Sequence, residues 1–91
     1  MTPRKVDANQ AAIVAALRAA GCGVIDAHTL GDDIPDLIVS YWTGGPITVL
    51  MEVKSAGGKL SDGQTKFQAA WPGLVYTVWS AEDALRQIGK V

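Results

Sequence analysis

Three charged residues lie at the outer ends of two apolar stretches that a glycine-rich turn joins. Residues 34–55 read IPDLIVSYWTGGPITVLMEVKS, so Asp36 lies near the start and Glu52 and Lys54 lie near the end. If residues 43–45 form a loop between two antiparallel strands, the numbers of facing residues add to 88. Asp36 is then expected to lie opposite Glu52, with both side chains on one face of the sheet.

Two carboxylates placed side by side predict a bound cation. The Cβ atoms of directly opposed residues are about 4.5 to 5.5 Å apart, and two carboxylates at that distance repel unless a proton or a cation lies between them. A divalent metal held by Asp36, Glu52 and the backbone carbonyl of Val53 resolves this repulsion. Lys54 follows Glu52 by two residues and points to the same face. The set suits phosphodiester hydrolysis, in which the metal activates water and Lys54 stabilises the developing negative charge.

Each charged residue also has a purely structural interpretation. Asp36 could cap a turn after Pro35, and Glu52 and Lys54 could form the frayed, solvated end of a strand. If all three residues had only these structural roles, their spacing in the sequence and their shared face of the sheet would both be coincidental. We therefore favour the metal site.

The composition limits the size and class of the protein. Its 91 residues, of which 48% are hydrophobic, are expected to form one domain over residues 1–91. The net charge of −1 gives no sign of a strongly basic surface that would grip long nucleic acid. The single cysteine, Cys22, excludes an internal disulfide and zinc-type spacing, and we expect it to be buried. No apolar run is long enough to span a bilayer and no signal peptide opens the chain, which predicts a cytoplasmic location.

Hydrophobic periodicity and turn signals predict the elements around the charged residues. Asp7 and Gln10 have the spacing of a capping box, and apolar residues then recur at helical spacing. Ser61 and Gln64 form a second capping box before a helix that ends at Pro72. The expected strands cover residues 23–28, 36–42, 47–54 and 74–79, with a loop over 29–35 and a last helix over 80–88.

The order of these elements predicts an α/β fold with a mixed four-stranded sheet flanked by helices. The order is helix, three strands, helix, strand, helix. The first three strands are joined by short connections and should pair antiparallel, whereas a helical crossover should place the fourth strand parallel to the third. Helices that cover the sheet would explain why the strands are apolar on both faces.

The charged motif and its surroundings resemble a known nuclease superfamily. Pro35-Asp36, fifteen intervening residues and Glu52-Val53-Lys54 look like the signature of the PD-(D/E)XK superfamily, and the element order resembles its restriction-endonuclease-like core. The closer resemblance is to the small standalone VRR-NUC nucleases of phages and bacteria. The matching features are Gln10 in the leading helix, Gly31 before Pro35-Asp36, Glu52-Val53-Lys54, the GKLSDGQ of residues 58–64 and the VYTVWSAEDAL of residues 75–85.

The resemblance implies a Mg²⁺-dependent deoxyribonuclease, with Mn²⁺ as a possible substitute. It further implies that the substrate is branched or structured DNA, such as a four-way junction, in a bacterial or phage-infected cell. It implies that Gln64 orients the attacking water or contacts a phosphate, although its spacing from Ser61 fits helix capping equally well. Gln10, Lys59 and Lys66 are candidate substrate contacts. For Gln10 we favour the capping role, and solvated surface positions are the default for the two lysines.

The chain also departs from the family pattern. Family members often have glutamate where Gln10 stands, which makes a second metal less expected. Asp32 and Asp33 could supply outer contacts to the metal site or only keep their loop solvated. Gln64 and Gln68 stand where the related RecB-like branch has a glutamine and a tyrosine, which argues against that branch.

Four further side chains were assigned from their positions in the expected elements. Trp71 and Trp79 are predicted to lie in the core, whereas Trp42, beside the glycine turn, is predicted to be exposed and available to stack on a base or a partner chain. His28 is predicted to be a surface residue at a strand end rather than a metal ligand.

The sequence is also compatible with two other functions. One is a catalytically silent nuclease fold that binds DNA or a protein, and the other is a small adaptor whose charges only stabilise strand ends. A domain of this size has little area with which to hold a duplex, so we expect a homodimer through a sheet edge or the hairpin tip around residues 42–46.

Overall fold

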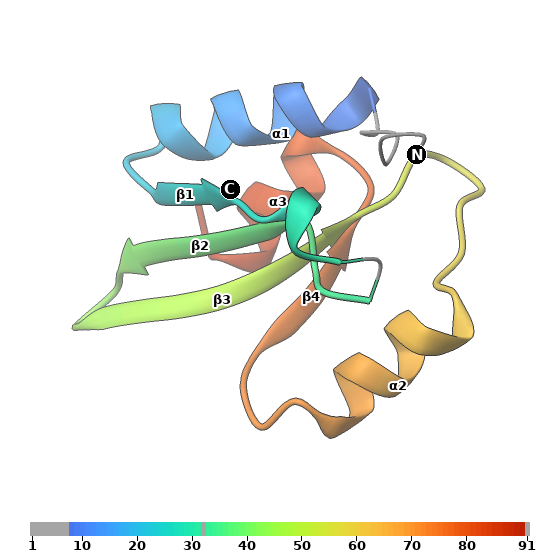
Figure 1. The fold of residues 1–91 in the computed structure, drawn as a ribbon. Helices are drawn as coiled ribbons and strands as arrows, with labels where there is room; N and C mark the ends of the chain where they lie inside the picture. The colour runs from blue at the N-terminus through green and yellow to red at the C-terminus, as the bar shows by residue number, and fades with distance from the viewer. Residues whose placement is uncertain (1–7, 32, 91) are drawn as a thin grey trace.

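The computed structural model describes residues 8–31 and 33–90, and over these ranges the chain forms three α-helices and one four-stranded sheet (Figure 1). The predicted α/β class and the order of helices and strands are confirmed. The helices are α1 (Ala8–Ala19), α2 (Asp62–Ala70) and α3 (Ala81–Gln87), and a 3₁₀ helix, η1, spans His28–Leu30. The strands are β1 (Gly23–Asp26), β2 (Leu37–Trp42), β3 (Pro46–Val53) and β4 (Val75–Val78).

The sheet has the strand order β1-β2-β3-β4. The pairs β1–β2 and β2–β3 are antiparallel, and β3 and β4, which α2 connects, are parallel. The predicted pairing directions are therefore confirmed. Because β2 and β3 are the central strands, residues at their ends are better sheltered from water than residues on the edge strands β1 and β4. In the described part of the chain, no helix is both long and apolar enough to cross a membrane.

The β2–β3 hairpin has the predicted loop and register. Leu37 pairs with Met51 and Trp42 pairs with Pro46, so the two numbers add to 88 in both pairs. The loop between the strands is therefore residues 43–45. Gly44 in this loop has a φ of +69°, a backbone conformation that a residue with a side chain rarely adopts.

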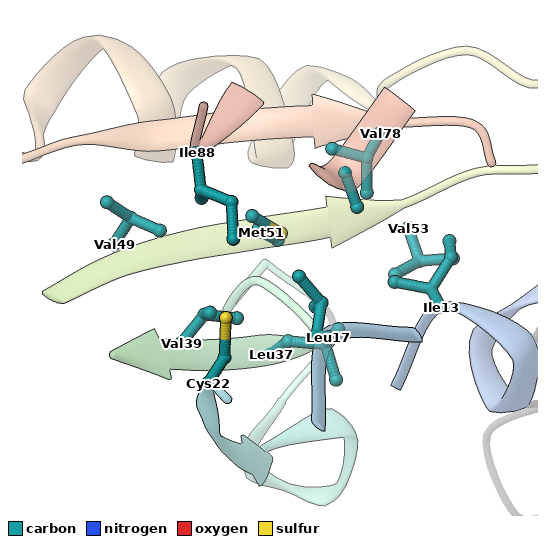
Figure 2. Close-up of a cluster of buried hydrophobic side chains, with 11 residues drawn as sticks. Ile13, Leu17, Cys22, Leu37, Val39, Val49, Met51, Val53, Val78 and Ile88 are labelled. Carbon is teal, nitrogen blue, oxygen red and sulfur yellow. The ribbon is translucent and has the colours of Figure 1, made fainter. Parts of the chain in front are cut away.

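One face of the sheet packs against α1 and α3 (Figure 2). On β3 the buried residues of this face lie at every second position, so Glu52 and Lys54 point to the opposite face. The buried cluster consists of Ile13, Leu17, Cys22, Leu37, Val39, Val49, Met51, Val53, Val78, Ala84 and Ile88. The predicted burial of Cys22 is thus confirmed.

The helix α2 lies on the other face, beside β4. The side-chain amide of Gln68 donates a hydrogen bond to Thr77 Oγ1 at 3.0 Å, and Thr77 is the β4 partner of Glu52 in the parallel ladder. This face is covered only in part, because Ser40 and Thr48, farther toward the hairpin tip, are exposed. Helices therefore cover the two faces of the sheet unequally.

Three strands are shorter than predicted: β2 begins one residue late, at Leu37, and β1 and β4 are each two residues shorter. β1 ends at Asp26 rather than at residue 28, because the Asp26 carboxylate accepts a hydrogen bond from the backbone N–H of His28 at 3.1 Å and the chain turns into η1. β4 spans Val75–Val78, and its flanking residues Leu74 and Trp79 are 51% and 45% exposed. The expectation of a fully buried strand is wrong here, because β4 is an edge strand.

The tryptophans also differ from expectation. Trp71 and Trp79, predicted to lie in the core, are each 45% exposed, because both follow the last residue of an element at the margin of the fold. Trp42 is 71% exposed, as predicted. Asp7, the predicted cap of the first helix, lies outside the described residues.

Candidate active site

Asp36 and Glu52 meet where the central strands β2 and β3 end. The register of the hairpin, continued by one residue beyond Leu37, places Asp36 opposite Glu52. The two residues are 5% and 1% exposed. Glu52 therefore does not belong to a frayed, solvated strand end. Burial of ionised carboxylates is costly unless their charge is compensated, so this pair is a candidate ligand set for a cation.

The carboxylate of Asp36 also has a structural contact. Its Oδ2 accepts a hydrogen bond from the backbone N–H of Val53 at 2.8 Å. β2 begins only at Leu37, because Pro35 cannot continue the strand. The Asp36 side chain therefore accepts the N–H of Val53 in place of a backbone carbonyl of a longer β2. The carbonyl of Val53 points to the same side of β3 as its N–H, toward Asp36. The Val53 carbonyl, predicted to be a metal ligand, therefore faces the Asp36 side of the strand.

Lys54 is half-buried and its backbone is held from both sides. Its N–H donates to the carbonyl of Val78 at 3.0 Å. Its carbonyl accepts from the side-chain amide of Asn9, which also donates to the carbonyl of Trp79 at 2.6 Å. Asn9 thus ties α1 to the ends of β3 and β4 beside Lys54. Sequence reasoning missed Asn9, because its partners lie 45 and 70 residues away and no local pattern signals them.

Gln64 has the capping role that its spacing allows. Its side-chain carbonyl accepts from the N–H of Ser61 at 2.9 Å, and its own N–H donates to Ser61 Oγ at 3.1 Å. Both halves of the capping box at the start of α2 are therefore present. Gln64 is nevertheless only 6% exposed, and it lies in the first turn of the helix. The amide is thus buried while it caps the helix.

The loop before Asp36 contacts the start of α2. A Cβ atom added to Gly63 would lie 2.2 Å from Oδ1 of Asp33, so only a glycine leaves room for the carboxylate in this position. An anionic group at a helix N-terminus is favourable because of the helix dipole. The contact places the Asp36 loop beside the first turn that carries Gln64. Asp32, the other acidic residue assigned to this loop, lies outside the described residues.

Gln10 contacts β1 rather than the predicted metal pair. It is 2% exposed, and its side-chain amide donates to Oδ2 of Asp26 at 3.0 Å. The other oxygen of Asp26 contacts Nδ1 of His28, which lies in η1. Burial raises the pKa of Asp26, but the hydrogen bonds with His28 and Gln10 lower the pKa by more, so it falls below its usual range. The capping partner that we favoured for Gln10, Asp7, lies outside the described residues.

The remaining predicted substrate contacts lie on the surface. Lys59 and Lys66 are exposed, in the loop before α2 and on α2 itself. An open groove of about 330 Å³ lies along α1, lined by Gln10, Ala11, Val14, Ala15, Arg18 and Asp26. Neither Asp36 nor Glu52 lines this groove, so it is separate from the candidate site.

The ligand set fits magnesium better than zinc. Over residues 8–31 and 33–90, no group of three or more His, Cys, Asp or Glu side chains is placed to hold a metal ion. The protein ligands on offer are therefore the carboxylates of Asp36 and Glu52 and the carbonyl of Val53. Mg²⁺ is commonly held by one or two carboxylates and keeps several of its waters, whereas zinc prefers nitrogen and sulfur ligands.

Comparisons with family models, with curated proteins and with solved structures give no match for this chain.

Proposed function

We propose that the protein is a metal-dependent endonuclease that hydrolyses DNA phosphodiester bonds at the Asp36–Glu52 pair. The observation that carries this proposal is the burial of two carboxylates at facing positions of the central strands, with Lys54 on the same face as Glu52. Like charges in this arrangement favour a cation between them. A purely structural pair would be expected at a more solvated position.

Asp36, Glu52 and the carbonyl of Val53 would hold the ion, which we propose is Mg²⁺, with Mn²⁺ as a substitute. When bound, such an ion polarises the scissile phosphate and lowers the pKa of a water that attacks it. The Asp36 carboxylate already accepts the N–H of Val53 through Oδ2. That hydrogen bond orients the carboxylate before the ion arrives.

Lys54 would stabilise negative charge that develops on the phosphate. Its side chain points to the Glu52 face, and its backbone is held by Val78 and Asn9, so the ammonium starts from a fixed strand end. A water-orienting role for Gln64 would have to be combined with its capping role, because its carbonyl oxygen accepts the N–H of Ser61. Lys59 and Lys66 would contact the phosphate backbone beyond the scissile bond.

The restriction-endonuclease-like core and the preference for branched or structured DNA are part of this proposal. Both rest on the resemblance of the Pro35-Asp36 and Glu52-Val53-Lys54 motif to the VRR-NUC nucleases. A homodimer through a sheet edge or the hairpin tip would bring two sites to a symmetric junction. Light scattering at micromolar concentration tests the dimer, and a mass that stays near 9.6 kDa when junction DNA is added would exclude it.

Cleavage and metal binding are tested together. The purified chain is incubated with single-stranded, duplex, flap and four-way-junction DNA in Mg²⁺, in Mn²⁺ and in EDTA, and Mg²⁺ binding is measured by calorimetry. We expect cleavage only with a divalent ion, and loss of both cleavage and binding in Glu52→Gln. Glu82→Gln is the matched control, because Glu82 is an exposed glutamate on α3. Equal cleavage by the Glu52→Gln and Glu82→Gln variants would overturn the proposal.

The second candidate is a catalytically silent module of the same fold. The Asp36–Val53 hydrogen bond favours this module, because the contact gives Asp36 a structural role that needs no metal. Such a module would bind DNA or a protein without cutting, so the cleavage panel separates it from a nuclease. An adaptor, the remaining class, would show no Mg²⁺ binding at all.

A further inference from the structure

Phe67 and Trp71 form a stacked aromatic pair at the C-terminal end of α2. Their ring centroids are 5.3 Å apart and the ring planes differ by 15°. Phe67 is half-buried, whereas Trp71 is 45% exposed. Aromatic rings attract one another by offset stacking, so Phe67 supports one side of the indole while much of its surface faces solvent.

The indole is also held by the turn that follows. A Cβ atom added to Gly73 would lie 2.8 Å from Nε1 of Trp71, so the ring packs directly against the backbone of Gly73. A side chain fixed in this way loses little conformational entropy when a second flat ring packs against it. Trp71 is therefore a pre-ordered aromatic surface rather than a mobile exposed side chain.

Trp71 ends a stripe of side chains on α2 that passes beside Thr77, the β4 partner of Glu52. Gln64, Phe67, Gln68 and Trp71 are spaced three and four residues apart, so they share one side of α2. Gln64 is buried in the first turn, and Gln68 bonds Thr77, the neighbour of Glu52 on β4. From Gln64 to Trp71 the helix rises about 10 Å. A DNA strand that is bound at Glu52 and runs along α2 toward its C-terminal end would therefore pass Trp71.

We propose that Trp71 stacks on an unpaired nucleobase of the DNA strand bound at the candidate active site. This inference rests on the proposed nuclease function and makes the substrate class more specific: a strand with at least one unpaired base beside the scissile phosphate. Stacking needs access to the face of the base, which a continuous duplex does not offer.

A protein surface is a poorer occupant for this site. The exposed residues of the first two turns of α2 (Asp62, Thr65 and Lys66) are polar, so the exposed apolar groups beside Trp71 are confined to the short stretch of residues 69–74. Protein interfaces need a well-packed patch of about 800 Å² on each partner. A single nucleobase, in contrast, can stack on the exposed indole of Trp71 alone.

The test uses tryptophan emission in EDTA, where no cleavage is expected. Three variants each keep one tryptophan: Trp42→Phe with Trp79→Phe, Trp42→Phe with Trp71→Phe, and Trp71→Phe with Trp79→Phe. Each is titrated with a single-stranded thymidylate hexamer, with an abasic hexamer of equal charge and with a blunt duplex. We expect the thymidylate hexamer to quench Trp71 most strongly, with less quenching by the abasic strand and the duplex.

Affinity provides the second readout. In the otherwise unchanged chain, Trp71→Ala should weaken binding of the thymidylate hexamer about tenfold and leave binding of the abasic hexamer unchanged. Equal affinities of wild type and Trp71→Ala, or quenching confined to Trp42 or Trp79, would overturn the inference. So would light scattering in which Trp71→Ala abolishes self-association, because a second copy would then be the occupant.

The inference and the proposed function fail separately. Base-dependent quenching of Trp71 without divalent-dependent cleavage would support stacking and reject the nuclease. Metal-dependent cleavage with no effect of Trp71→Ala on the thymidylate hexamer would retain the nuclease and reject stacking.

Discussion

The carboxylate of Asp36 accepts the backbone N–H of Val53 at 2.8 Å, so one side chain both completes the β-ladder and faces the candidate metal site. The two roles are separable by mutation. Asp36→Asn keeps a side-chain oxygen as acceptor but removes a negative charge, so we expect it to abolish metal binding and to raise the metal-free melting temperature.

Asp36→Ala should also abolish metal binding but lower the melting temperature. It leaves the buried N–H of Val53 without its present acceptor, which costs about 1 to 3 kcal/mol. For a domain of this size each kcal/mol corresponds to roughly 4 to 8 °C. Thermal melts in EDTA compare the two variants, and a lower melting temperature for Asp36→Asn as well would favour a purely structural role.

Glu52→Gln should remove Mg²⁺ binding and stabilise the metal-free protein. Glu52 is 1% exposed and faces Asp36, so its neutralisation relieves repulsion at a site with little solvent screening. We expect a gain of about 1 kcal/mol in the free energy of unfolding, measured in urea with EDTA present. Glu82→Gln on α3 serves as the control and should change the stability by less than about 0.5 kcal/mol. A destabilised Glu52→Gln variant would count against the repulsive pair.

Lys54→Ala should leave the fold and Mg²⁺ affinity nearly intact and lower turnover by at least about a hundredfold. The substitution removes the ammonium but keeps the backbone bonds of Lys54 to Val78 and Asn9. The measurement is single-turnover cleavage of the best substrate in the DNA panel. Lys90→Ala, at an exposed position near the end of the chain, is the control. Near-normal turnover in Lys54→Ala would exclude this catalytic role.

Gly63 and Asp33 should show coupled effects on stability. Alanine has a higher helix propensity than glycine by up to about 1 kcal/mol, but a Cβ at position 63 displaces the Asp33 carboxylate from the helix N-terminus. Gly63→Ala should therefore stabilise the protein more in an Asp33→Ala background than in the wild type. A double-mutant cycle in urea should give a coupling of at least about 0.5 kcal/mol. Additive effects would mean that the contact contributes nothing.

Asp26 should contribute stability that depends on pH in the acid range. Its folded-state pKa lies below the unfolded value of about 3.9, because the hydrogen bonds with His28 and Gln10 outweigh the effect of burial. The contribution is therefore fully present above about pH 5 and is lost as the pH falls through the folded-state pKa. We expect Asp26→Asn to be less stable than wild type by up to about 1 kcal/mol at pH 7, with the difference shrinking toward pH 3. A difference that grows on acidification would contradict this assignment.

Local sequence was sufficient to predict the geometry of the hairpin. The Gly-Gly turn and the alternating positions on either side set the loop at residues 43–45, and the register that places Asp36 opposite Glu52 follows from the loop. The capping box of Ser61 and Gln64 was predictable for the same reason, since its partners are three residues apart. The element order and pairing directions followed from connection lengths.

Contacts between distant parts of the chain were decided only by the tertiary structure. Asn9 reaches the carbonyls of Lys54 and Trp79, and Gln10 turns to Asp26, because packing of α1 on the sheet determines which groups lie within reach. The exposure of Trp71 has the same origin. A tryptophan that follows an apolar helical stripe looks like a core residue, and only the packing of the end of α2 leaves Trp71 45% exposed.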